Sequence, residues 1–215
     1  GSEMCIRDRF KGLDRIYNNF VYDFLYPNPA SVLAFIENHD TDRFLGEGNN
    51  LPMLKQASTL LLTTRRIPQL YYGTEVMMNG VKSKSDGYVR KDFPGGWTGD
   101  ATNALTPAGR TKIQNECYDF YKTILNWRKG NDVIAKGSMV QFMVQNGVYA
   151  YARQYEGKTI FVMLNGTDAE TTVPLKFYKE ILKDSKQGKD ILSGKAITFG
   201  EELKMGPRES LVIEL

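Results

Sequence analysis

The chain has 215 residues, of which 41% are hydrophobic and 25% are charged, values ordinary for a globular protein and unlike those of disordered chains. Its 28 basic residues are interleaved with 25 acidic ones and the net charge is only +3, so no basic stripe indicates nucleic-acid binding. Apolar runs such as 60–62 and 160–164 fall far short of the roughly 20 residues that a membrane span needs.

Residues 1–9 are expected to be a cloning scar or a disordered terminus. The start, Gly1 to Met4, is typical of a vector-derived sequence followed by a start codon, and no apolar region of a secretion signal follows. Localisation is therefore left open, with the periplasm and the extracellular space as options. The two cysteines, Cys5 and Cys117, have no metal-like spacing, so neither a zinc site nor a disulfide framework is predicted.

The first predicted elements alternate between helix and strand. Apolar residues recur at intervals of three and four from Phe10 to Tyr26, which predicts an amphipathic helix that Pro27 ends. Ser31 to Ile36 is a short apolar run, typical of a strand covered on both faces in a parallel sheet. A second helix is predicted from Leu51 to Arg65 and a second buried strand from Ile67 to Tyr72. Strand, helix and strand in this order predict a βαβ unit.

A long polar segment separates this unit from a third helix. Residues 74–105 are rich in Gly, Lys and Asp and show no period, which predicts an extended loop; loops of this length are usually functional or disordered. Thr106 is a typical N-cap and Pro107 fits the first helical position, so the third helix is expected to start there. It should run to Lys129, with Gly130 at its C-terminal end.

From about Val133 the pattern changes to short strands separated by turns. The predicted strands lie at 140–144, 148–153, 159–164, 171–175, 197–199 and 210–215. Asn146-Gly147, between the first two, is a strong hairpin signal. Residues 177–184 fit either a helical turn or a strand. Together these features predict an antiparallel sheet or sandwich after an α/β region.

The single histidine of the chain, His39, stands beside Asp40 directly after the first predicted strand. In parallel α/β folds, ligands bind at the carboxyl ends of the strands. A neutral imidazole can donate to one sugar hydroxyl and accept from another, and a carboxylate can stabilise positive charge on a reacting carbon. The alternative is that both residues only cap the following loop, and residue types alone do not decide between the two.

Two segments carry a family resemblance. Phe35 to Arg43 (FIENHDTDR) resembles the fourth signature region of the α-amylase family of glycoside hydrolases (family 13), at the end of that family's seventh barrel strand. Ile67 to Glu75 (IPQLYYGTE) is similar to the segment that forms the eighth strand. The segments 40–43, 86–90 and 93–97 resemble those of neopullulanase or cyclomaltodextrinase. The resemblance implies the C-terminal part of a (β/α)8 TIM barrel at 10–132, followed by an antiparallel β-sandwich domain at 133–215.

The resemblance also implies roles for three neighbouring residues. Asp40 matches the carboxylate that grips the sugar hydroxyls and stabilises the transition state. His39 matches the histidine that binds the same sugar, and Arg43 would be a further substrate contact.

Three later residues are weaker candidates for substrate binding. Asp86 and Arg90, spaced i and i+4, resemble a pair that holds the next sugar, and the alternative is an ordinary loop ion pair. Trp97 would stack on a sugar ring or, equally, would serve as a packing anchor. No metal site is identified and no cofactor is expected, although calcium is bound by some members of the family.

A retaining glycosidase needs two carboxyl groups about 5 to 5.5 Å apart, one a nucleophile and one an acid/base. In the resembling family both lie upstream, on the fourth and fifth strands, and neither motif is found in this sequence. The resemblance therefore implies that the chain is a fragment of a retaining α-glucan hydrolase, an enzyme that cleaves α-1,4 bonds in maltooligosaccharides. The fragment alone is expected to be inactive. Uncovered barrel strands predict self-association. The alternatives are a non-catalytic carbohydrate-binding or interaction module, and a purely structural fragment.

Overall fold

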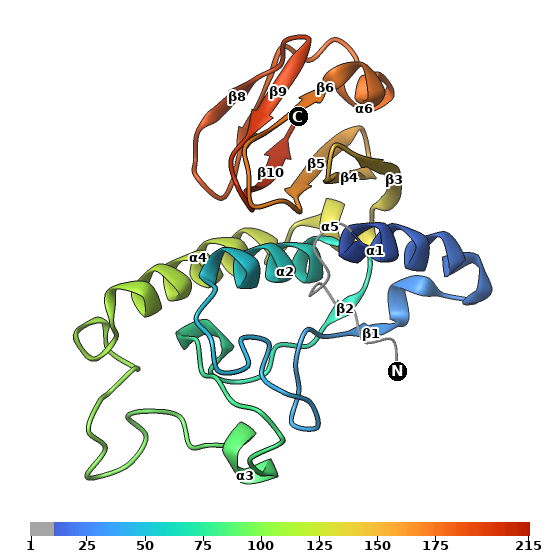
Figure 1. The fold of residues 1–215 in the computed structure, drawn as a ribbon. Coiled ribbons are helices and arrows are strands. Elements are labelled where there is room, and N and C mark those ends of the chain that lie inside the picture. The colour runs from blue at the N-terminus through green and yellow to red at the C-terminus, as the bar shows by residue number, and fades with distance from the viewer. Residues whose placement is uncertain (1–10) are drawn as a thin grey trace.

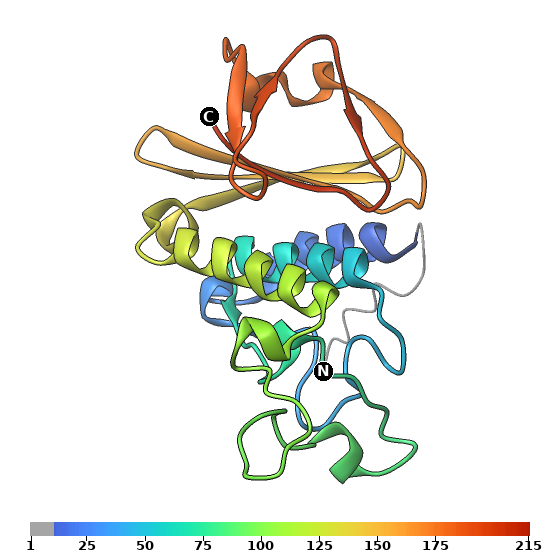
Figure 2. The same cartoon turned by 90° about the vertical axis from the view of Figure 1, so that its left-hand side faces the viewer.

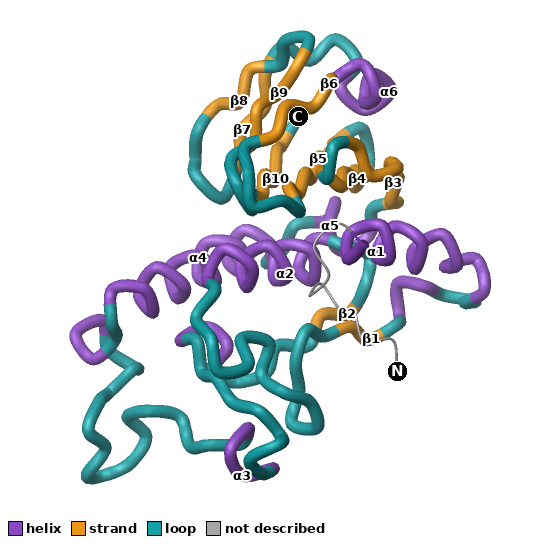
Figure 3. Tube along the Cα trace, viewed as in Figure 1, coloured by secondary structure: helices purple, strands orange, loops and turns teal. Residues whose placement is uncertain are grey.

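The computed structural model describes residues 11–215, so the expectation for residues 1–9 lies outside the described part of the chain. Figure 1 shows a β-rich part formed by the C-terminal residues, a layer of long helices next to it, and extended loops on the far side of the helices. Figure 3 shows that these loop segments are mostly irregular. No helix within the described residues is long and apolar enough to cross a lipid bilayer.

Up to residue 137 the regular elements are α1 (Lys11–Val21), β1 (Leu33–Ala34), α2 (Leu51–Thr63), β2 (Ile67–Pro68), α3 (Asp86–Val89), α4 (Lys112–Arg128) and α5 (Asp132–Lys136). Single turns of 3₁₀ helix lie at Tyr22–Leu25, Pro29–Ser31, Thr74–Val76 and Pro107–Gly109. The β-rich part, residues 138–215, contains β3 (Ser138–Gln145), β4 (Val148–Tyr155), β5 (Lys158–Asn165), β6 (Thr171–Pro174), a 3₁₀ turn (Leu175–Tyr178), α6 (Lys179–Leu182), β7 (Gln187–Asp190), β8 (Ala196–Thr198), β9 (Glu202–Met205) and β10 (Ser210–Glu214).

Helices α1, α2 and α4 lie side by side against one face of the main sheet (Figure 2). The apolar stripe of α1 is buried in the core that this face forms, at Leu13, Ile16 and Phe20. Helix α2 begins at an Asn50 cap, whose side chain accepts from the backbone N–H of Met53 at 3.1 Å, and is buried along most of its length. The predicted helices 10–26 and 51–65 are confirmed, the first continuing as a 3₁₀ turn.

Strands β1 and β2 pair in parallel, with Leu33 opposite Ile67 and Ala34 opposite Pro68, and α2 connects them. The predicted βαβ order is therefore confirmed. The prediction that both strands are buried on both faces was wrong. Each strand has only two residues, Leu33 is 54% exposed and Ile67 is 49% exposed. Within the described residues each strand has only the other as a neighbour, so nothing extends the ladder or covers its outer side.

The third long helix starts later than expected. Thr106 does accept a hydrogen bond as a cap, but the turn that it caps ends at Gly109. Helix α4 begins at Lys112 behind a second cap, Thr111, which forms a reciprocal capping box with Gln114. The box satisfies two orphan N–H groups at once, so the later of the two cap signals sets the start of the helix.

The hairpin predicted at Asn146-Gly147 is confirmed. Both residues have positive φ, 51° and 78°, as a tight two-residue turn between right-handed twisted strands requires. Residues 177–184, for which helix and strand were both open, are mostly helical. Strands β7 and β9 were not predicted, because their sequences, QGKD and ELKM, contain no β-branched or aromatic residue.

The β-rich part is an antiparallel sandwich. A six-stranded sheet has the order β3-β4-β5-β10-β7-β8, and β6 pairs with β9 in a second, two-stranded sheet. Alternate residues of the central strands point to opposite faces. Tyr149, Tyr151 and Val162 join the core shared with the helices, whereas Phe161 and Met163 join the core between the two sheets. This sheet confirms the antiparallel fold expected for the second half of the chain.

Arg153 of β4 connects the helical layer to the sheet. Its side chain is almost completely enclosed, at 1% exposed, and its guanidinium donates to four carbonyls. The acceptors are Thr63 O at 2.9 Å, Ile134 O at 2.9 Å, Gly137 O at 2.8 Å and Ser138 O at 3.3 Å. Thr63 ends α2 and Ile134 and Gly137 lie at the end of α5, where helix dipoles favour a cation. Burial lowers the pKa of Arg153 to about 10, which leaves it protonated at neutral pH.

Replacing Arg153 with methionine should lower the free energy of unfolding by about 3 kcal/mol or more, because four buried carbonyls lose their donor. The measurement is urea denaturation followed by circular dichroism. Lys136→Met is the control, since Lys136 forms an exposed ion pair with Asp132 and a surface contact 5.7 Å from the centre of the Tyr155 ring, and its loss should leave the midpoint almost unchanged. Equal midpoints for the two variants would contradict the role given to Arg153.

Candidate functional site

The loop after β1 presents His39 and Asp40 to solvent. Asn38 organises this loop: its side chain accepts from the N–H of Asp40 at 2.8 Å, and its own N–H donates to Thr41 Oγ1 at 3.0 Å. The side chains of His39 and Asp40 are 59% and 63% exposed and lie 3.2 Å apart, Nε2 to Oδ2. Asn38 and Thr41 therefore form the hydrogen bonds that close the loop, and the side chains of His39 and Asp40 face solvent.

Arg90 brings the two predicted segments together. Its Nη2 lies 3.2 Å from Asp40 Oδ1 and 3.1 Å from Asp86 Oδ2, and its Nε donates to His39 O at 2.9 Å. Helix α3, capped by Ser85, places Asp86 and Arg90 one turn apart. Asp86 and Arg90 therefore form an ion pair, which was the alternative to a sugar-binding pair, and Arg90 also contacts Asp40. We call His39, Asp40, Asp86 and Arg90 the Asp40 cluster.

Lys82 is a member of this region that the sequence did not reveal. Its Nζ lies 3.4 Å from Asp86 Oδ1 and donates to Asp40 O at 3.1 Å, and its N–H donates to Asp42 Oδ1 at 2.7 Å. A lysine in a polar loop carries no periodic signal, so nothing in its surroundings distinguished it from other exposed lysines.

A buried ion pair lies beneath the cluster. Glu37 is 2% exposed and accepts from Arg43 Nη1 at 3.1 Å, from the N–H of Phe44 and from the hydroxyl of Thr74. Strand alternation was expected to point Glu37 away from Asp40, but β1 ends at Ala34 and alternation does not reach these residues. Glu37 is buried, whereas the Asp40 side chain is 63% exposed. With three donors around it, Glu37 is not free to transfer a proton.

Arg43 lies inside the loop and not on its surface, which differs from the expected substrate contact. Besides Glu37, its guanidinium donates to Tyr72 O at 2.7 Å and Val89 O at 3.0 Å and lies 3.9 Å from the centre of the Tyr71 ring. Burial raises the pKa of the Tyr71 hydroxyl. Sequence position alone could not show that the chain turns inward between Asp40 and Arg43, because the partners of Arg43 come from distant segments.

Trp97 is not connected to the Asp40 cluster by any contact among the described residues. It is 69% exposed, and its N–H donates to Asp100 Oδ2 at 3.0 Å. This exposure argues against the packing-anchor alternative, and the stacking role stays a prediction. Within residues 11–215 no group of three or more His, Cys, Asp or Glu side chains is arranged to hold a metal ion.

The cluster offers the chemistry that a sugar needs. Carboxylates accept hydrogen bonds from hydroxyls, a guanidinium donates them, and an imidazole does both. Because all four side chains are exposed, their ion pairs are screened by water, and a ligand can exchange for them at low cost.

Replacing Glu37 with glutamine should loosen the loop that carries Asp40, because an amide N–H₂ would face Arg43 and Thr74. Breaking a buried pair of this kind costs about 3 kcal/mol. Hydrogen–deuterium exchange should accelerate at residues 38–44. Glu47→Gln is the control, since Glu47 pairs with Lys84 on the surface, and unchanged exchange in Glu37→Gln would rule out this role.

Known proteins resemble this chain in sequence, both over its C-terminal domain and over most of its length. Residues 139–214 match the family model of the cyclo-malto-dextrinase C-terminal domain. An α-amylase from Niallia circulans is 29% identical over 201 residues, which are 90% of this chain and 33% of that protein. A cyclomaltodextrin glucanotransferase from Thermoanaerobacterium thermosulfurigenes is 30% identical over 192 residues, 86% of this chain and 24% of that protein. The chain thus spans a third or less of these relatives.

Solved structures show the same fold. The crystal structure of an Anoxybacillus α-amylase superposes with a TM-score of 0.75 at 21% identity, covering 94% of this chain and 42% of that one. CldA, a cyclomaltodextrin glucanotransferase, superposes with a TM-score of 0.70 at 23% identity, covering 98% of this chain and 42% of that one. The sequence matches make the chain a homologue of the C-terminal portion of α-amylase-family glycoside hydrolases (family 13), and the solved structures share its fold.

Proposed function

We propose that the chain is part of a retaining α-glucan hydrolase or transglycosylase acting on α-1,4 bonds, and that the Asp40 cluster forms one wall of a glucose-binding subsite. The observation that carries this proposal is the position of Arg90, within 3.2 Å of both Asp40 and Asp86. It joins two segments that resemble sugar-binding motifs of one family. The names of the relatives, α-amylase and cyclomaltodextrin glucanotransferase, and a similar structure of AmyP with maltotriose, support the same substrate class.

The proposal includes a domain division. Residues 10–132 would be the last portion of a (β/α)8 barrel and residues 133–215 its C-terminal domain. The parallel β1-α2-β2 unit supports this division, as does the position of His39 and Asp40 after the carboxyl end of β1, where barrel enzymes bind their substrates. A neopullulanase-like specificity, suggested by the DTDR sequence at 40–43, belongs to the same proposal.

Each member of the cluster has a role in this proposal. Asp40 accepts hydrogen bonds from adjacent hydroxyls and stabilises positive charge as the glycosidic bond breaks. His39 binds the same sugar, and Asp86 and Arg90 bind the next one. Arg43 holds the loop from beneath through Glu37 and Tyr72. No residue of the chain is assigned as nucleophile or acid/base, so we expect sugar binding without cleavage.

A non-catalytic binding module is the second candidate. It is favoured by one observation: Glu37, three residues before Asp40, is buried and accepts hydrogen bonds from three donors. The carboxyl pair of a retaining glycosidase is therefore not completed by this residue. Binding alone fits both candidates, and the parent gene, with or without the missing motifs upstream, separates them.

Maltotriose should bind at the Asp40 cluster and should not be hydrolysed. In an NMR titration the amide signals of 38–43 and 86–90 should shift, and Asp40→Ala should weaken binding about tenfold through the loss of a charged acceptor. Asp92→Ala, a change of an exposed carboxylate in the neighbouring loop, is the matched control. Signals that stay unmoved would contradict the subsite, and glucose release abolished by Asp40→Ala would contradict the expected lack of cleavage.

We also propose self-association through exposed apolar residues around β1 and β2. We call them the β1–β2 patch: Val21, Tyr22, Phe24, Leu25, Tyr26, Leu33, Phe35, Ile67, Leu70 and Tyr72. Both strands have an unpaired edge within the described residues, and edges with apolar neighbours favour pairing with another chain.

Sedimentation velocity should show dimers or larger species whose fraction grows with concentration. The double variant Leu33→Lys/Ile67→Lys should shift the chain to monomer, because charges on an edge strand oppose pairing. Phe177→Ser, which removes an exposed aromatic residue outside the patch, is the control. A monomer at all concentrations for the unaltered chain would refute this association.

A further inference from the structure

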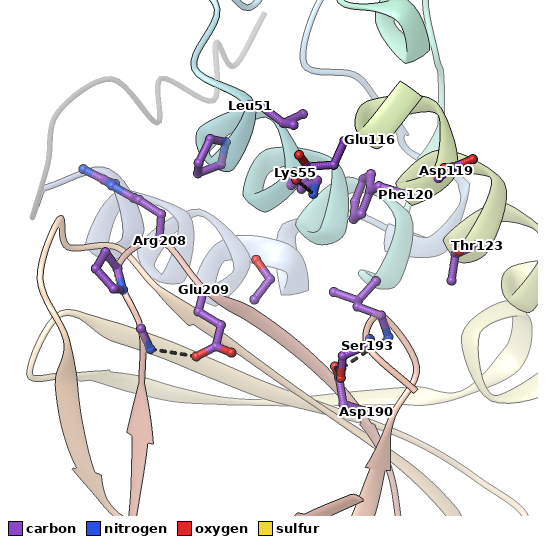
Figure 4. A pocket seen from close by; sticks show the side chains of 15 residues that line it. Leu51, Lys55, Glu116, Asp119, Phe120, Thr123, Asp190, Ser193, Arg208 and Glu209 are labelled. Atoms are coloured by element: carbon purple, nitrogen blue, oxygen red, sulfur yellow. Dashed lines mark hydrogen bonds and ion pairs between the residues drawn. The ribbon is translucent and has the colours of Figure 1, made fainter. Parts of the chain in front are cut away.

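A groove lies between residues of α2 and α4 and the turns of the β-rich part (Figure 4). Helix α3 lies on the other side of these helices (Figure 1). The volume of the groove is about 600 Å³, within the range of roughly 300 to 1,000 Å³ typical of small-molecule sites. Residues of α2 and α4 form one wall, and the turns at 190–193 and 206–210 form the other. Figure 4 shows Lys55, Glu116 and Phe120 on the helical wall, across from Asp190, Ser193 and Glu209.

The helical wall presents a fixed aromatic ring. Phe120 is half-buried and packs edge-on against Tyr121, with 5.3 Å between the ring centroids. Lys55 Nζ lies 5.9 Å from the centre of the Phe120 ring and is held by Glu116 Oε1 at 2.7 Å. A ring whose position is set from behind can bind the apolar face of a sugar without a large loss of side-chain entropy.

The opposite wall presents hydrogen-bonding groups. Asp190 is buried and fixes its turn by accepting from Ser193 and from the N–H of Val212. Glu209 Oε2 accepts from the N–H of Gly206 at 2.7 Å, and its other oxygen has no protein partner among the described residues. Ser210 Oγ is enclosed and has no hydrogen-bond partner in the same part of the chain. An enclosed hydroxyl without a partner is uncommon, and a ligand hydroxyl would satisfy it.

The charge of the lining narrows the class of ligand. Two basic side chains and four acidic ones line the groove, a formal net charge of −2: Lys55, Arg208, Glu116, Asp119, Asp190 and Glu209. This excess of negative charge disfavours phosphates and acidic peptides. Since the described residues hold no metal-type cluster, a metal ion is disfavoured as well. An aromatic ring with spare carboxylate and hydroxyl oxygens suits a neutral molecule with many hydroxyls.

We propose that this groove, the Phe120 groove, is a second and non-catalytic site that binds a segment of neutral α-glucan chain. The identity of the sugar rests on the proposed function, whereas the site itself rests on the cavity, the ring and the open acceptors. The groove and the Asp40 cluster share no residue and lie on different sides of the helices (Figure 1). A glucan held here would keep a long substrate near the protein without contacting the reacting bond.

The test is an NMR titration of the whole chain with maltotriose and maltoheptaose. Signals of 116–123, 190–193 and 206–210 should shift as one set with a shared dissociation constant. Phe120→Ala should raise that constant about fivefold by removing the stacking face. Phe120→Leu should do the same while keeping apolar volume against Tyr121, which guards against a folding defect. Phe177→Ala is the matched control and should change nothing.

The outcomes separate the two sites. If the groove signals stay unmoved, or if Phe120→Leu binds as tightly as the unaltered chain, the proposed groove site is overturned. In Asp40→Ala the groove signals should still shift with an unchanged constant, and their loss would overturn the site as independent. Movement of the groove signals without movement at 38–43 would instead contradict the subsite at Asp40 and leave the groove standing.

Discussion

The buried guanidinium of Arg153 is the interaction on which the arrangement of the chain depends. It has no carboxylate partner among the described residues, and its charge is stabilised by hydrogen bonds to carbonyl oxygens at the ends of α2 and α5 and at the start of β3. A cation in such a place is stable only while all of these ends stay in position. It therefore fixes α2 against the sheet, and α2 in turn holds β1 and β2 in parallel.

A second buried arginine performs a similar task nearer to the candidate site. Arg43 contacts a carboxylate, two carbonyls and an aromatic ring, and these partners come from the loop after β1, from the turn after β2 and from α3. Above this rigid base the His39 and Asp40 side chains remain exposed. A rigid support beneath accessible charged side chains suits a binding site, because side chains that are already held in place lose little entropy when a sugar binds.

Local signals in the sequence predicted the elements that depend on local chemistry. The helices α1 and α2 and the Asn146-Gly147 hairpin follow from apolar spacing and from positive φ at the turn. The exposure of Leu33 and Ile67 could not be predicted, because burial of a strand depends on neighbouring strands and not on its own composition. For the same reason the inward position of Arg43, the contribution of Lys82 and the Phe120 groove were missed, since each depends on segments far apart in the chain.

If His39 and Asp40 form one wall of a glucose subsite, a crystal structure of the chain soaked with maltotriose should show it. Two adjacent hydroxyls of one glucose ring should lie on the carboxylate of Asp40 and a hydroxyl on the His39 imidazole, while Arg90 contacts the next ring. Density for the sugar elsewhere, with the Asp40–Arg90 ion pair intact and water in front of it, would contradict the claim.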